Sequence, residues 1–137
     1  MGAFNGKILM VGFGAVAQCA LPILRKLVPQ VPAKNITVMD FENKSKEMKK
    51  YRAQGVKWVR DRVTRKNLRS ILAKYLDRGD LFIDLAWNID AAELLQWCHD
   101  RGVLYVNTSV EGGEACEGGG TQQPTRKALG YGQRARR

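Results

Sequence analysis

Short apolar runs alternate along the chain with segments whose apolar residues recur at helical spacing. The runs show no regular change between apolar and polar residues, which is typical of strands buried on both faces of a parallel sheet. They predict strands at residues 7–11, 35–39, 56–59, 81–85 and 103–107. The segments between them predict helices at residues 15–28, 43–54, 64–79 and 90–101.

The expected helices have recognisable ends and faces. Pro22 lies inside the first helix and predicts a kink or the local loss of one hydrogen bond. The expected capping residues of the other three are Asn43 or Ser45, Thr64 and Asp90. The apolar face of the first helix is expected to consist of Val16, Ala20, Ile23, Leu24 and Leu27. That of the third is expected to consist of Leu68, Ile71, Leu72, Tyr75 and Leu76.

The regular alternation of strand and helix indicates an α/β fold. It predicts right-handed crossovers and a parallel, doubly wound sheet of about five strands in the order 3-2-1-4-5. From residue 112 the pattern stops, and residues 112–137 are rich in glycine and basic residues. Their only large apolar side chains are Leu129 and Tyr131, too few to offset the entropy of ordering the segment. We therefore expect a folded domain over residues 1–111 and a disordered tail over residues 112–137.

The composition is that of one globular domain, with 137 residues, 45% hydrophobic and 26% charged. Because no apolar run approaches the ~20 residues that span a bilayer, no membrane segment is expected. The net charge is +10, and much of it lies between Lys44 and Lys74. This stretch is expected to form the outer faces of two helices, which favours a solvated surface over a nucleic-acid site.

The three cysteines, Cys19, Cys98 and Cys116, are far apart and form no C-x-x-C pair. Neither a zinc site nor a disulfide framework is therefore indicated, and a reducing, cytoplasmic setting fits best. Cys19 and Cys98 are expected to be core residues of their helices. His99, the only histidine, is expected at the surface near a helix end. No metal site, Ser-His-Asp set or paired-carboxylate site can be assembled from the sequence.

Where the first strand meets the first helix, the sequence reads Gly12-Phe13-Gly14-Ala15-Val16-Ala17, a G-x-G-x-x-A pattern. Gly12 permits a sharp turn, Gly14 lets the backbone approach a pyrophosphate, and Ala17 keeps the helix close to the strand. The helix N-terminus then presents free N–H groups and a partial positive charge to the phosphates. Because the pattern follows a buried strand and opens a helix, it favours a Rossmann-type dinucleotide site over a plain turn.

Asp40, at the end of the second strand, is the expected partner of the cofactor ribose. It lies 23 residues beyond Ala17, close to the ~20 expected for the acid that binds the ribose hydroxyls. A carboxylate there repels a 2′-phosphate and favours NAD over NADP. Lys44 and Lys46 nearby work against this preference, since they could attract that phosphate. The alternative role of Asp40 is that of a helix cap or turn former.

Two later strand ends supply further candidates, because open α/β sheets place their ligands at the carboxyl ends of the strands. Ala86, Trp87 and Asn88 follow the fourth strand and are expected to lie near the cofactor, with Trp87 equally suited to packing. Residues 108–111 follow the fifth strand and end in Glu111, a carboxylate that could meet a cationic substrate. A solvated loop acid is the alternative for Glu111.

Four stretches of the chain together are similar to the N-terminal domain of the homospermidine synthase family, among the saccharopine dehydrogenase-like enzymes. They read "ILMVGFGAVAQCALPIL", "ITVMD", "VTRKNLRSIL" and "LFIDLAWNIDAAELLQWCHDRGVLYVNTSVE". The likeness covers about residues 5–111. The glycine turn is shared with many dehydrogenases, whereas the run that ends in Thr108-Ser109-Val110-Glu111 is more specific.

The resemblance implies an NAD-dependent enzyme of polyamine biosynthesis. Such an enzyme oxidises putrescine, releases ammonia, and joins the product to a second putrescine as an imine, which the stored hydride reduces to homospermidine. By position, the resemblance implies that the glycine turn holds the pyrophosphate and that Asp40 holds the ribose. Asn88 and Glu111 would approach the nicotinamide and the substrate amine, and a carboxylate suits a diamine.

The resemblance breaks after Glu111, where the family continues with Pro-Trp and a large substrate domain. Here Gly112, Gly113 and the basic tail follow, which predicts a frameshift or premature truncation. Such a fragment would be inactive alone, because most of the substrate pocket is missing. Three other functions stay open: another saccharopine dehydrogenase-like oxidoreductase, a non-catalytic NAD-binding module and a nucleic-acid binder. Homo-oligomerisation is expected where a truncated sheet edge exposes apolar surface.

Overall fold

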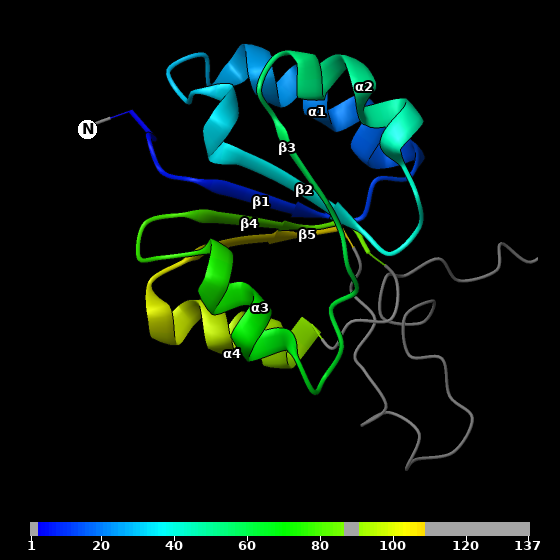
Figure 1. Cartoon of the computed structure of the whole chain (residues 1–137). Coiled ribbons are helices and arrows are strands. Elements are labelled where there is room, and N and C mark those ends of the chain that lie inside the picture. Colours follow the sequence, from blue (N-terminus) through cyan, green and yellow to red (C-terminus); the bar gives the residue numbers. More distant parts are fainter. Residues whose placement is uncertain (1–2, 87–90, 109–137) are drawn as a thin grey trace, which may run out of the picture.

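The computed structural model describes residues 3–86 and 91–108, which form a five-stranded parallel sheet (Figure 1). The strands lie in the order β3-β2-β1-β4-β5, so the predicted doubly wound sheet and its order are confirmed. Their bounds are Ile8–Val11 for β1, Ile36–Asp40 for β2, Lys57–Arg60 for β3, Leu81–Asp84 for β4 and Leu104–Asn107 for β5. The order reverses between β1 and β4, and that switch point is where such sheets bind ligands.

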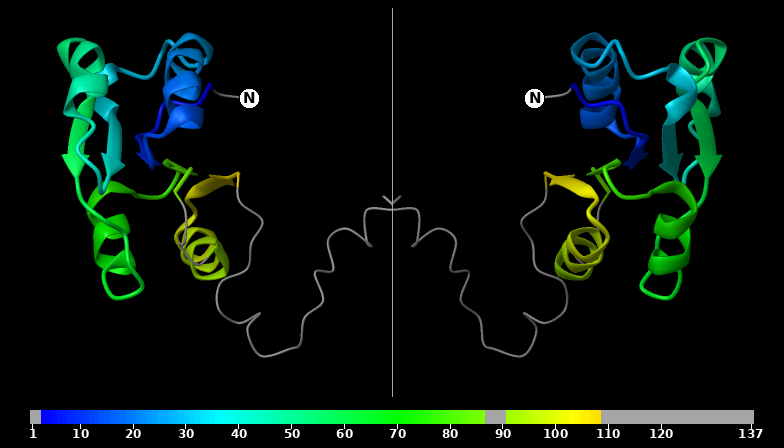
Figure 2. Two further views of the ribbon diagram at one scale, coloured as in Figure 1. Left: turned by 90° about the vertical axis from the view of Figure 1, so that its right-hand side faces the viewer. Right: turned by 90° about the vertical axis from the view of Figure 1, so that its left-hand side faces the viewer.

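Helices cover both faces of the sheet, as the two side views of Figure 2 show. Helices α1 (Ala15–Leu27) and α2 (Ser45–Ala53) lie on one face, and α3 (Leu68–Tyr75) and α4 (Ala91–Arg101) lie on the other. A short 3₁₀ turn, η1 (Ala33–Asn35), leads into β2. This division follows from right-handed crossovers that run outward from β1 in one half of the sheet and from β4 in the other.

The core has two halves, because successive strand residues point to opposite faces of the sheet. On β1, Ile8 and Met10 pack among the residues of α1 and α2, whereas Leu9 and Val11 pack among those of α3 and α4. All four are buried, which explains the unbroken apolar run in the sequence. The sheet therefore holds the ends of its strands in a fixed arrangement, and the candidate site lies at those ends.

The predicted apolar face of α1 is wrong for Val16, Ile23 and Leu27, whereas Leu24 packs against the core as expected. Its buried residues are Ala17 and Leu21, whereas Val16, Ile23 and Leu27 are 60%, 56% and 73% exposed. Cys19, expected in the core, is also exposed. Nearly every residue of α1 is apolar, so periodicity alone did not single out the face that meets the sheet. The small side chain of Ala17 selects it, because it lets the helix approach β1 closely.

The other helices agree better with the sequence pattern. On α3 the expected face is confirmed, since Leu68 and Leu72 are buried and Ile71 and Tyr75 pack against the same core. The predicted cap Thr64 is wrong, because α3 is capped at Asn67 one turn later. The N-terminal cap of α2 falls at Lys44, between the two expected residues. On α4 the predictions for Cys98 and His99 are confirmed, because Cys98 is buried and His99 is exposed. The predicted cap Asp90 lies outside the described residues.

One half of the sheet face that carries α1 and α2 is open. Leu81 and Ile83 of β4 point to this face and are only partly buried. Leu104 and Val106 of β5 are in register with them, so they point the same way, and they are 54% and 51% exposed. Among the described elements no helix lies over this half (Figure 2). The structure thus presents an apolar strip beside the exposed flank of α1.

Several sequence-based predictions fall outside the described residues. They concern the tail over residues 112–137 and the side chains of Trp87, Asn88 and Glu111. Within the described part of the chain, no helix is long and apolar enough to cross a membrane.

The orientation of α1 predicts that the same change, leucine to alanine, affects stability strongly at one position and weakly at another. Leu21→Ala should lower the free energy of unfolding by about 2–5 kcal/mol, because it leaves a cavity at a fully buried position. Leu27→Ala should change it by less than about 0.5 kcal/mol, because that side chain faces solvent. Urea unfolding of the two variants, followed by circular dichroism, measures the difference. Equal destabilisation by both changes would contradict this orientation of α1.

Candidate functional site

The turn after β1 is held by contacts that leave no room for a side chain at its first glycine. Gly12 has φ of +93°, a conformation that favours glycine. A Cβ atom there would lie 2.8 Å from the backbone carbonyl of Leu85, which follows β4. On the other side, the N–H of Gly12 donates to the carbonyl of Met39 in β2 at 2.8 Å. The turn is therefore fixed by both strands that flank β1.

The second glycine of the turn opens toward solvent. A Cβ atom on Gly14 would meet no other atom of the described residues within 4 Å. Gly14 is the N-cap of α1, and in the described part of the chain no side chain caps this helix end. The first N–H groups of α1 therefore lack intrahelical partners and carry the positive end of the helix dipole. Such a helix end, reached through an open glycine, suits a phosphate group.

Asp40 lies across the turn and is itself held in place by two backbone groups. Its Oδ2 accepts a hydrogen bond from the N–H of Phe13 at 2.6 Å, and its Oδ1 accepts one from the N–H of Glu42 at 2.8 Å. Asp40 is 8% exposed, so its carboxylate has little freedom to move. Each oxygen keeps a free lone pair, with which it can accept the hydroxyl groups of a ribose.

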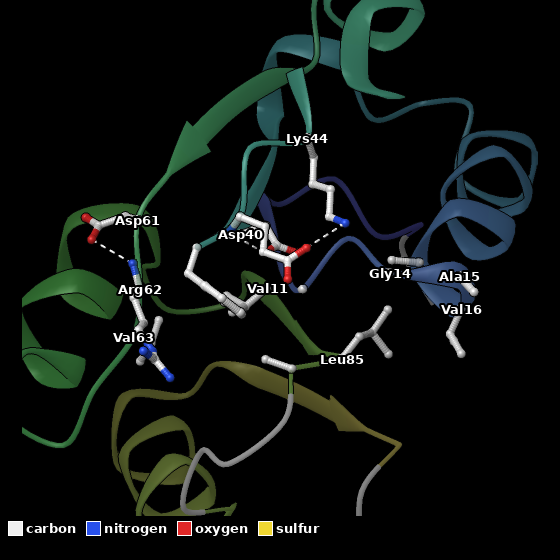
Figure 3. Close-up of a pocket in the computed structure, with 15 residues that line it drawn as sticks. Val11, Gly14, Ala15, Val16, Asp40, Lys44, Asp61, Arg62, Val63 and Leu85 are labelled. Atoms are coloured by element: carbon white, nitrogen blue, oxygen red, sulfur yellow. Dashed lines mark hydrogen bonds and ion pairs between the residues drawn. The ribbon is translucent and has the colours of Figure 1, made fainter. Parts of the chain in front are cut away.

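The turn, Asp40 and the loops after β2, β3 and β4 enclose a cavity of about 490 Å³ (Figure 3). This volume is typical of small-molecule and cofactor sites. The cavity is lined by Val11, Gly12, Gly14, Ala15, Val16, Ala17, Asp40, Phe41, Glu42, Lys44, Asp61, Arg62, Val63, Leu85 and Ala86. Five of these residues are charged and the others are apolar or glycine, which suits a ligand with a flat ring and charged groups.

The cavity brings together seven of the predicted cofactor residues: Gly12, Gly14, Ala15, Val16, Ala17, Asp40 and Ala86. Phe13 has a different role, because its side chain is buried in the core against Tyr51 and only its N–H serves the site. Trp87, Asn88 and Glu111 lie outside the described residues.

Sequence reasoning missed the wall formed after β2 and β3. Phe41 and Glu42 follow β2, and Asp61, Arg62 and Val63 follow β3. The signal was available, because the same rule that pointed to the ends of β4 and β5 applies to every strand of the sheet. On this wall the guanidinium of Arg62 lies 5.0 Å from the centre of the Phe41 ring, a cation–π contact.

A buried polar network lies at the ends of β4 and β5, next to the cavity. Asp84 is 3% exposed and accepts hydrogen bonds from the Tyr105 hydroxyl at 3.0 Å and from the N–H of Ala86 at 3.2 Å. Asn107 donates to the Tyr105 oxygen at 2.8 Å. Burial raises the pKa of the Asp84 carboxyl above its ordinary value. Since Ala86 lines the cavity, this network positions the wall after β4.

Among the described residues that line the cavity there is no serine, threonine, cysteine or histidine. Burial raises the pKa of the Cys98 thiol to about 11, so it stays protonated at neutral pH. Among the described residues, no group of His, Cys, Asp and Glu could hold a metal ion. An open helix N-terminus, a carboxylate at the end of the second strand and an apolar cavity at the switch point define a dinucleotide-binding domain of the Rossmann type.

Comparison with known proteins gives the same class and a family. The family described as the saccharopine dehydrogenase NADP binding domain matches residues 8–137. The chain belongs to this family. The crystal structure of a homospermidine synthase from Legionella pneumophila in complex with NAD has a similar fold, with a TM-score of 0.71 and 22% identity. The similarity covers 92% of this chain and 26% of that one.

Two homospermidine synthases resemble the sequence. The enzyme of Mesorhizobium japonicum is 26% identical over 113 residues, and that of Blastochloris viridis is 26% identical over 110 residues. These matches cover 80% and 78% of this chain. The chain spans only 23% and 22% of the length of these relatives.

The two glycines of the turn predict separable effects. Gly12→Ala should lower the free energy of unfolding by about 2–5 kcal/mol, because it adds strain at positive φ and a backbone clash. Gly14→Ala should leave stability within about 0.5 kcal/mol, because its backbone is extended and its Cβ meets no described atom. It should still weaken dinucleotide binding about tenfold or more, because the methyl group projects where the pyrophosphate would approach. Thermal unfolding measures stability, and calorimetric titration measures dinucleotide affinity. An unchanged affinity in Gly14→Ala would contradict a pyrophosphate site at this glycine.

The raised pKa of Asp84 predicts that its contribution to stability depends on pH. Below its ordinary value of 3.8 the carboxyl is protonated in both folded and unfolded chains. As pH rises through the folded pKa, only the folded chain must bury the charge, so stability falls. The free energy of unfolding of the parent chain, relative to Asp84→Asn, should therefore decrease from pH 4 to pH 7.

Tyr105→Phe is the companion variant for this test. The Tyr105 hydroxyl lowers the pKa of Asp84 by donating to its charged form, so removing the hydroxyl should make the loss of stability with pH steeper. Urea unfolding at several pH values measures both effects. The quantity to follow is the free energy of unfolding of the parent chain minus that of Asp84→Asn. If this value stays constant or rises with pH, burial does not have this role.

Proposed function

We propose that this chain is the NAD-binding portion of a homospermidine synthase, an enzyme that converts two putrescine molecules into homospermidine and ammonia. The observation that carries the proposal is the likeness to two homospermidine synthases, which covers about four fifths of the chain. That stretch is long enough to take in most of the strands that build the cavity, so the likeness concerns the site as well as the fold.

The preference for NAD is proposed from the chain's own side chains. The family description names NADP, whereas the Legionella pneumophila structure holds NAD. In this chain Asp40 is fixed by two backbone hydrogen bonds and cannot swing away from the ribose position. It can accept the two ribose hydroxyls of NAD, but it repels a 2′-phosphate at that place. Glu42 adds a second carboxylate to the same rim.

The residues present fit a bound dinucleotide. Gly14 and the first turn of α1 would hold the pyrophosphate, and Phe41, Arg62 and Val63 would flank the adenine end. Leu85 and Ala86 would form the wall toward the nicotinamide, in the position that the Asp84 network sets. When bound, the cofactor would supply hydride acceptance and return.

Asn88 and Glu111 remain the proposed substrate-side residues. Both follow strands whose carboxyl ends meet at the site, although neither is among the described residues. A carboxylate at Glu111 would pair with one ammonium group of putrescine through a charge-assisted hydrogen bond. An amide at Asn88 would supply a neutral hydrogen-bonding partner beside the nicotinamide.

We also propose that catalysis needs polypeptide beyond the cofactor domain. The chain spans less than a quarter of the length of the two relatives. The open apolar strip formed by Ile83, Leu104 and Val106 supports this proposal, because exposed apolar surface of this kind marks a place where further protein packs. The chain alone would then bind NAD without forming homospermidine.

A chimeric enzyme tests the proposed reaction. Residues 1–111 of this chain would replace the matching N-terminal segment of the Blastochloris viridis homospermidine synthase. With putrescine and NAD the chimera should form homospermidine, measured by chromatography of the derivatised polyamines, and NADP should support the reaction poorly. This chain by itself should form none.

The control is the same chimera carrying Gly14→Asp. A carboxylate at the helix N-terminus would repel the pyrophosphate, so homospermidine formation should be lost while the chimera stays folded. A chimera that is folded and binds NAD but forms no homospermidine would refute the proposed reaction. Equal rates with NAD and NADP would refute the proposed cofactor preference.

A further inference from the structure

The rim of the cavity beyond β2 carries an ion pair that the cofactor assignment does not use. The Nζ atom of Lys44 lies 2.9 Å from a carboxylate oxygen of Glu42 (Figure 3, dashed line). Both residues line the cavity, as Asp40 does. The side chain of Lys44 is 20% exposed and that of Glu42 is 57% exposed, so the pair lies at the rim of the cavity.

Lys44 is the cation best placed to meet a phosphate on the ribose next to Asp40. Its pKa is raised, chiefly by the hydrogen bond to Glu42 and in smaller part by the charges of Glu42, Asp40 and Glu47. Lys44 stands four residues after Asp40 in the chain, and both line the cavity. A lysine binds phosphate as a compact point charge, provided that its charge is not already engaged.

Arg62 is the other cation that lines the cavity wall near this rim. Its guanidinium lies over the Phe41 ring at 5.0 Å, on the wall that follows β3. Arg62 is thus engaged by the ring of Phe41, whereas Lys44 is engaged by the carboxylate of Glu42. The two cations can be distinguished by separate substitutions.

We propose that Glu42 is a specificity-determining residue, which withholds the charge of Lys44 from the 2′-phosphate of NADP by keeping it in the Glu42–Lys44 ion pair. This inference rests on the proposed NAD-binding function. Asp40 excludes the phosphate by repulsion, and Glu42 engages the compensating charge of Lys44. Cofactor choice in this chain therefore depends on two carboxylates with different roles.

The size of the effect follows from the exposure of the pair. An ion pair at the surface is weak, and an added phosphate contact to a lysine would be of similar strength. Releasing Lys44 should therefore change the ratio of NADP to NAD affinity by about threefold to tenfold. The preference would shift without reversing, because Asp40 remains in place.

Calorimetric titration of the full chain with NAD and with NADP tests the proposal. Glu42→Gln keeps the shape of the side chain and removes its charge, so NADP should gain about threefold to tenfold relative to NAD. In the Lys44→Met background the same Glu42 change should alter the ratio less than about twofold. The matched control is Glu47→Gln, which removes an equal charge in the first turn of α2 from a residue that does not line the cavity. It too should alter the ratio less than about twofold.

The outcomes separate the inference from the function on which it rests. An unchanged ratio in Glu42→Gln would overturn the proposal, as would a full gain that persists in the Lys44→Met background. A gain that is lost only with Arg62→Ala would assign the phosphate contact to Arg62 and overturn the role of Lys44. A chain that binds neither dinucleotide would instead refute the proposed function. A gain that depends on Lys44 and falls with rising salt supports the proposal.

Discussion

The hydrogen bond from the backbone N–H of Phe13 to the carboxylate of Asp40 joins the glycine turn to the end of β2. At 2.6 Å and in a buried place, it is a strong charge-assisted contact. Gly12 adds two further contacts to this junction. Its N–H donates to the carbonyl of Met39, and the backbone of Leu85 lies so close that it leaves no room for a Cβ atom. The direction of α1, and hence of its free N–H groups, depends on these contacts. Asp40 thus builds the site as well as facing it.

The two edges of the sheet differ in character. The β3 edge carries exposed Lys57 and Arg60, charges that discourage pairing with another strand. The β5 edge has exposed Leu104 and Val106 instead, beside a sheet face that no described helix covers. A domain that is closed at one edge and open at the other is suited to join further protein on the open edge. The cavity lies between the two, so a partner on the β5 side would approach the end of the cavity that Leu85 and Ala86 form.

The sequence allowed the strand order, the glycine turn and the position of Asp40 to be predicted, because each depends on local patterns with a fixed period or spacing. The buried face of α1 could not be predicted in this way. Most residues of this helix are apolar, so the pattern alone leaves more than one face that could meet the sheet. Leu21 and Leu27 are the same residue type, but Leu21 is buried and Leu27 is exposed. Phe13 shows the same limit, since a residue inside the motif can point into the core. The ion pair of Glu42 and Lys44 could not be predicted either, because it depends on the path of the loop after β2.

The charge of the whole chain does not decide which cofactor the site prefers. A net charge of +10 would attract any anionic dinucleotide, and NADP more than NAD. Salt screens such long-range attraction over about 8 Å, so at the ribose only the nearest groups count. The charged side chains that line the cavity are Asp40, Glu42 and Asp61 against Lys44 and Arg62, and Lys44 is already paired with Glu42. The charges that line the cavity therefore sum to a negative value, although the whole chain is positive. Selection against a 2′-phosphate and attraction of the dinucleotide as a whole can coexist, because they act over different distances.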